Sequence, residues 1–151
     1  MPTELGWRPA DGNMGGFDAV NDQNPLPVAV MRTSPYYPQP FTYPLAGSVA
    51  ILLKNAQGFL NSLIATNVNA AIRYLQIFNQ TTVPATGNVP VISLPIPAGS
   101  ATVPGQWTLG DDFLGKDGLF LSAGIAIGVS TTAATFTAAT ATEHTVNGTF
   151  T

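Results

Sequence analysis

The chain has 151 residues, a net charge of −3 and no cysteine, and only 9% of its residues are charged, against about a quarter in an average soluble protein. The negative balance and the scattered basic residues exclude a nucleic-acid partner, and the lack of cysteine excludes disulfides and thiolate chemistry. This length accommodates one domain with a substantial core. The low fraction of charged residues favours a protein whose faces are covered by partners.

Residues 1–44 are set apart by their proline content and predict an extended N-terminal arm. Eight of the chain's 13 prolines lie here, at positions 2, 9, 25, 27, 35, 38, 40 and 44. Proline at this density prevents a continuous helix or central strand. A disordered tail would be poor in large apolar groups, whereas this segment carries many aromatic rings. We expect the arm to pack on its own domain or on a neighbouring subunit, with these anchors: Trp7, Phe17, Tyr36, Tyr37 and Phe41.

Residues 45–151 are expected to form one domain, because short alternating segments follow one another between turn residues. Alternation over 49–53, a turn at 55–58 and a further apolar segment predict two paired strands. In the second of these strands, three apolar residues are expected to share one face: Leu60, Ile64 and Val68. Residues 70–79 fit both a helical and a strand period, but their strand-like neighbours favour a strand.

The segment 91–97, VISLPIP, predicts a strand at the edge of a sheet. Its apolar residues occupy alternate positions, at Ile92, Leu94 and Ile96. Alternation of this kind is the period of a strand. Pro95 and Pro97 lack a backbone N–H, so one side of the strand has too few donors for a central position.

Further strands are predicted in 101–109, 119–129 and 144–151, with a loop or exposed edge in the Ala/Thr-rich tract 130–142. In 119–129 one face is apolar and the other holds only glycine and alanine, which permits close approach by another backbone or protomer. Short strands at regular spacing, separated by glycine and proline turns, predict an all-β protein. The expected architecture is an antiparallel β-sandwich of the jelly-roll kind, preceded by the extended arm.

No group of residues predicts catalysis, a cofactor or a metal site, so we expect the chain not to be an enzyme. His144, the single histidine, is expected to be exposed at a strand end. Asp111, Asp112 and Asp117 could supply oxygens to calcium, but their spacing fits no EF-hand loop and a turn-forming role is favoured. Trp7 and Trp107 are candidates for stacking on a sugar, although a packing role is favoured for each.

Three landmarks resemble a known group of proteins: RYL at 73–75, LPIPAG at 94–99 and GIA at 124–126. Together with the segment 24–28, they are similar to small virion structural proteins of tailed bacteriophages. The matching residues are scaffold residues of the predicted strands. The resemblance implies a head decoration (cement) protein, a homotrimer, and the major capsid protein as partner. It also implies synthesis in the host cytoplasm and a final location in the virion, on the phage head.

The function expected from the sequence is therefore structural: stabilisation of the phage head through the N-terminal arm and side-chain faces. A membrane partner is not expected, because the longest apolar-leaning run, 118–129, is far shorter than the roughly 20 residues that span a bilayer, and the N-terminus lacks a signal-peptide pattern. Two alternatives stay open. One is a carbohydrate- or receptor-binding module of a spike or tail, since jelly rolls also form lectin-like domains. The other is a cellular sandwich protein unrelated to viruses.

Overall fold

A computed structural model describes residues 38–43 and 49–151 of the chain. These residues are nearly all strand or loop, with one helical turn, α1 (Asp111–Leu114), and one 3-10 turn, η1 (Ala141–Glu143). The strands are β1 (Gln39–Tyr43), β2 (Ala50–Lys54), β3 (Gly58–Asn67), β4 (Arg73–Asn79), β5 (Ile92–Ile96), β6 (Gly105–Leu109), β7 (Leu119–Leu121), β8 (Ile125–Ser130) and β9 (His144–Phe150).

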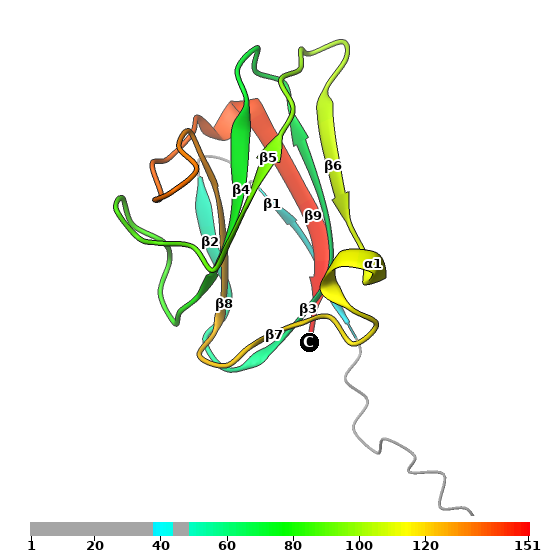
Figure 1. Cartoon of the computed structure of the whole chain (residues 1–151), viewed down its shortest axis with the longest axis vertical. Coiled ribbons are helices and arrows are strands. Elements are labelled where there is room, and N and C mark those ends of the chain that lie inside the picture. The colour runs from blue at the N-terminus through cyan, green and yellow to red at the C-terminus, as the bar shows by residue number, and fades with distance from the viewer. Residues whose placement is uncertain (1–37, 44–48) are drawn as a thin grey trace, which may run out of the picture. The chain divides into compact units, whose positions relative to one another are not determined.

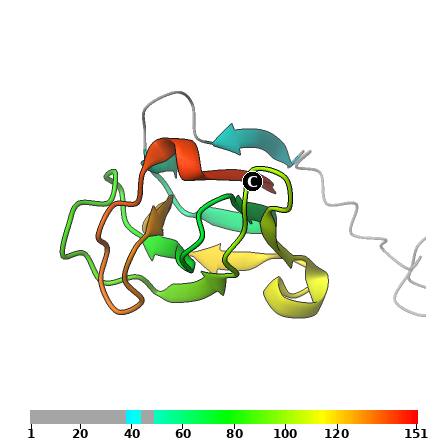
Figure 2. The ribbon, with the colours of Figure 1, turned by 90° about the horizontal axis from the view of Figure 1, so that it is seen from above.

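The strands form two antiparallel sheets that pack face to face (Figure 1). The first, here called the β9 sheet, has the order β1-β9-β3-β6, with the short β7 paired to β3. The second, the β8 sheet, has the order β2-β8-β4-β5. Seen from above in Figure 2, β1 (cyan) lies beside β9 (red), on the far side of the molecule from β5.

The pairing of the strands is that of a jelly roll. The chain folds like one long hairpin ribbon: β4 pairs with β5 at its closed end, and β3 with β6, β2 with β8 and β1 with β9 follow. Folding this ribbon over on itself gives two Greek keys in two sheets. The predicted all-β antiparallel sandwich of jelly-roll kind is confirmed, and Gln39–Tyr43, the end of the predicted arm, forms its first strand.

The β4–β5 hairpin confirms the edge strand predicted from proline. β5 has β4 as its one strand neighbour in the described chain, which is where a strand tolerates proline. Ile92 and Leu94 pack against the core and Ile96 is fully buried, so the predicted apolar face points inward.

The core lies between the two sheets and is lined by apolar side chains from both. Each fully buried Leu or Ile contributes about 1.5–3 kcal/mol relative to exposure. The large, fully buried side chains of this core come from six strands, with one each from β1 and β5 and the rest from β3, β4, β8 and β9: Tyr43, Ile96, Leu60, Leu63, Leu75, Ile77, Ile125, Ile127, Val129 and Val146.

The predicted pairing of the segments 49–53 and 60–68 is wrong. β2 pairs with β8, whereas β3 pairs with β9, β6 and β7, so the two strands belong to different sheets. The tight turn at 55–57 carries the chain from one sheet to the other rather than closing a hairpin.

The prediction that Leu60 and Ile64 share one face of the strand is also wrong. A β-bulge between Leu60 and Ser62 shifts the side-chain alternation by one residue. Beyond the bulge, Leu63 and Ala65 point into the core, whereas Ile64 is 40% exposed on the outside.

The segment 119–129 contains two strands, not the single strand predicted. β7 belongs to the β9 sheet and β8 to the β8 sheet. The turn between them is held by Asn79, whose side-chain oxygen accepts a hydrogen bond from the Ala123 N–H at 2.7 Å. A methyl group on Gly124 would lie 2.5 Å from the Gln80 carbonyl oxygen, so this turn requires glycine.

Candidate interaction surface

The five strands of the β9 sheet contain no aspartate, glutamate, lysine or arginine. Among the described residues, the charged side chains lie instead on β2, β4, α1, η1 and the loop after α1. A solvent-facing sheet surface normally carries charged side chains, which keep it soluble and prevent unwanted association. The cores of protein interfaces, by contrast, are depleted of charge.

The outward side chains of this sheet form a neutral surface, here called the uncharged face. In one row across the four strands, Thr108, Ile64, Asn147 and Thr42 are consecutive register partners. Neighbouring rows contain hydroxyls, amides and one proline. The full set is Pro40, Thr42, Ser62, Ile64, Thr66, Gln106, Thr108, Thr145, Asn147 and Thr149, each exposed or half-buried.

One pair of side chains on neighbouring strands of the uncharged face is joined by a hydrogen bond. The hydroxyl oxygens of Ser62 and Thr149 are 2.9 Å apart and share a hydrogen bond. Ile64 lies in the middle row with its side chain partly open to solvent. The face is therefore neutral, and it has an apolar side chain near its centre.

The outer face of the β8 sheet differs, because loops of the same chain cover it. Phe136 is 2% exposed, packs edge-on against Phe78, and exchanges backbone hydrogen bonds with Gly87 and Asn88. A methyl group on Gly128 would lie 2.6 Å from the Phe136 ring. The bare face that was expected to admit another backbone or protomer thus receives a side chain from the chain's own Ala/Thr-rich tract.

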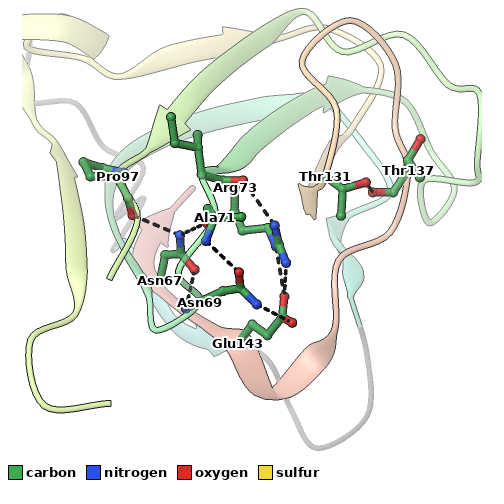
Figure 3. Close-up of polar contacts among 9 residues, drawn as sticks. Asn67, Asn69, Ala71, Arg73, Pro97, Thr131, Thr137 and Glu143 are labelled. Atoms are coloured by element: carbon green, nitrogen blue, oxygen red, sulfur yellow. Dashed lines mark hydrogen bonds and ion pairs between the residues drawn. The ribbon is translucent and has the colours of Figure 1, made fainter. Parts of the chain in front are cut away.

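A polar cluster at one end of the sandwich joins three loops (Figure 3). The buried Asn67 donates to the carbonyl oxygens of Ala71 and Pro97, both at 2.9 Å. Glu143 accepts hydrogen bonds from Arg73, at 2.7 and 2.9 Å, and from Asn69, at 2.7 Å. These contacts hold the turn after β3 against η1 and against the loop after β5.

The electrostatics of this cluster are those of a structural ion pair. Burial alone would raise the pKa of Glu143, but the hydrogen bonds and the charge of Arg73, with help from the Thr140 backbone and Asn69, lower it overall. Both carboxylate oxygens of Glu143 have partners within the chain. The cluster therefore stabilises the loops and presents no free acid or base.

His144 is buried, so the prediction of an exposed histidine is wrong. It is 3% exposed, and its ring centroid is 5.8 Å from that of the fully buried Tyr43 on β1. Burial lowers the pKa of His144 from 6.5 to about 4, against the opposing effects of the Thr140 backbone and Glu143. The error arises because His144 faces the same side of β9 as Val146, and Tyr43, distant in sequence, covers it.

Of the predicted arm anchors, Phe41 is the one within the described chain. It lies on β1, packs partly against the core, and its ring centroid is 6.1 Å from that of Phe150. The predictions for Trp7, Phe17, Tyr36 and Tyr37 fall outside the described residues.

The remaining candidates do not come together as a site. Asp111 and Asp112 lie in α1, and Asp117, in the next loop, has its carboxylate 3.7 Å from the Lys116 ammonium group. In the part of the chain that the structure describes, no three acidic or histidine side chains are grouped so as to hold a metal ion. Trp107 lies opposite the buried Ala65 at the sheet edge and is 38% exposed.

Sequence reasoning missed the uncharged face, although a signal for it was present. The segments that form the β9 sheet all lack charged residues, but so do β5 and β8 of the other sheet, and the assignment of the five strands to one sheet requires the jelly-roll pairing. No protein-family model, curated protein or solved structure matches the chain. Among the helices of the described residues, none is long and apolar enough to cross a membrane.

Proposed function

We propose that the chain is a structural component of a virion, a decoration protein that binds the capsid shell through the uncharged face. The observation that carries the proposal is a sheet of five strands without a charged side chain, in a protein with 9% charged residues. Supporting it are the resemblance of residues 73–75, 94–99 and 124–126 to phage virion proteins and, by analogy of fold alone, the use of jelly rolls in viral capsids.

The chemistry of the face indicates the kind of partner it suits. Neutral hydroxyl and amide groups lose less free energy on desolvation than charged groups, provided they find new hydrogen bonds. Ile64, near the centre, gains from burial. A neutral protein surface with both apolar and hydrogen-bonding groups therefore fits this face better than a highly charged one.

The size of the face implies that one copy binds weakly. The face spans four strands that lie about 4.8 Å apart. With about six residues per strand and about 3.4 Å per residue, its flat area is roughly 400 Å². A standard interface buries about 800 Å² on each partner. We infer that the missing affinity comes from linked copies, as in the proposed homotrimer, and from the N-terminal arm, since linked weak sites bind far more tightly than single ones.

The test uses purified virus particles from the genome that encodes the chain. Quantitative mass spectrometry is expected to find the chain in hundreds of copies per particle. Particles stripped of the chain are then mixed with the full-length protein or with a truncation that begins at residue 38, which retains β1. We expect the full chain to bind and the truncation to bind less. Absence of the chain from particles, or a few copies only, would refute the decoration role.

A further inference from the structure

A buried histidine lies against the last residue of the edge strand β1. His144 begins β9 and is almost fully buried, and Tyr43, whose ring it contacts, ends β1 and is fully buried. In the described chain β1 pairs with β9 alone, whereas β9 is also held by β3 along most of its length. The contact between His144 and Tyr43 therefore joins a singly attached strand to the rest of the sheet.

The surroundings of His144 offer little to a positive charge. Neither ring nitrogen has a hydrogen bond of standard geometry, and the Thr140 backbone gives only partial compensation. The charged groups that act on the ring are Glu143, which favours the cation, and Arg73, which disfavours it, and these two are paired with each other at 2.7 Å. Tyr43 is the titratable group whose ring faces it. A proton on His144 is thus a buried charge without an adequate partner.

We propose that protonation of His144 releases β1 from β9, so that β1 is an acid-sensitive latch at the edge of the sandwich. Release of β1 removes Tyr43 from the imidazole and admits water to it. Release of β1 breaks one strand pairing, which is five residues long. The other way to bring water to His144, detachment of β9, would break the pairings of β9 with both β1 and β3. Local opening proceeds through the element with the fewest contacts.

The expected size of the effect follows from the two protonation states. Burial holds the pKa of His144 at about 4 in the closed state, and water returns it toward 6.5 when β1 is open. The open state therefore gains protons as the pH falls below 6.5, and its population relative to the closed state rises. Between pH 8 and pH 5 the expected rise is about 30-fold.

The test is amide hydrogen exchange by NMR on the full chain between pH 8 and pH 5, expressed as protection factors that remove the intrinsic pH dependence. His144 is the only histidine in the chain, so its ring resonances report its protonation without overlap. We expect the protection of the β1 amides to fall about 30-fold at pH 5 and to lie well below that of the β4 and β8 amides at both pH values, because β1 opens without unfolding of the sandwich.

The variants His144→Phe and His144→Gln do not titrate, and one of them suffices if the other fails to fold. In either, β1 protection is expected to be independent of pH. The proposal is overturned if β1 protection in the unmodified chain does not change with pH, if it equals that of β4 and β8 at both pH values, or if the variants show the same loss.

Discussion

Replacement of Phe136 and Gly128, singly and together, probes how the chain covers the outer face of its β8 sheet. Phe136→Ala removes a buried ring, and such changes cost about 3–5 kcal/mol in protein cores. Gly128→Ala places a methyl group 2.6 Å from the Phe136 ring and 3.2 Å from the Ala50 side chain, and overpacking of this kind costs about 1–3 kcal/mol. In the double variant the ring is gone, so the methyl group occupies part of the space that it leaves.

The double variant is therefore expected to be more stable than the sum of the single effects predicts, by about 1–2 kcal/mol. Urea unfolding followed by circular dichroism gives the free energies of unfolding. Gly124→Ala is the matched control, because its methyl group would meet the backbone oxygens of Gln80 and Lys54 rather than Phe136. Its effect should add to that of Phe136→Ala. Additivity of the Gly128 and Phe136 changes, within about 0.5 kcal/mol, would refute the packing described.

Three further changes test the interior and the edge. In the unmodified chain the free energy of unfolding should fall by about 2 kcal/mol between pH 8 and pH 5, because the stability that comes from the lowered pKa of His144 is complete above pH 6.5 and declines toward pH 4. His144→Phe should remove this fall, and urea unfolding at both pH values measures it. Asn67→Ala should cost about 1–3 kcal/mol in the same assay, since the fully buried Asn67 side chain loses its hydrogen bonds to the Ala71 and Pro97 carbonyl oxygens. Pro95→Val restores a backbone N–H in the edge strand β5 and should promote concentration-dependent association, detectable by analytical ultracentrifugation.

Features fixed by local chemistry could be predicted from the sequence. Pro95 in β5 and Pro97 directly after it favour an edge position wherever the strand is placed, and the alternation of apolar residues determines the inward face of β5. The all-β class follows likewise from short alternating segments between turn residues.

Features that depend on distant segments could not be predicted. The bulge after Leu60 shifts the alternation of inward and outward side chains along β3 by one residue, and no spacing in the sequence reveals it. His144 is buried because Tyr43, about a hundred residues earlier in the chain, packs against it, and Gly128 is bare because Phe136 covers it. The uncharged face emerges only when four segments from both ends and the middle of the chain are aligned in one sheet.

The most direct test of the central claim is a charge placed in the uncharged face. Ile64→Lys introduces a cation at its centre, and Val89→Lys makes the same kind of change at a residue that is 73% exposed on the loop between β4 and β5. Both variants should remain folded by circular dichroism. When each is mixed with particles stripped of the chain, Val89→Lys should bind like the unmodified protein and Ile64→Lys should bind at least ten times more weakly, a loss of about 1.4 kcal/mol or more. Equal binding by the two variants would contradict the assignment of this face as the docking surface.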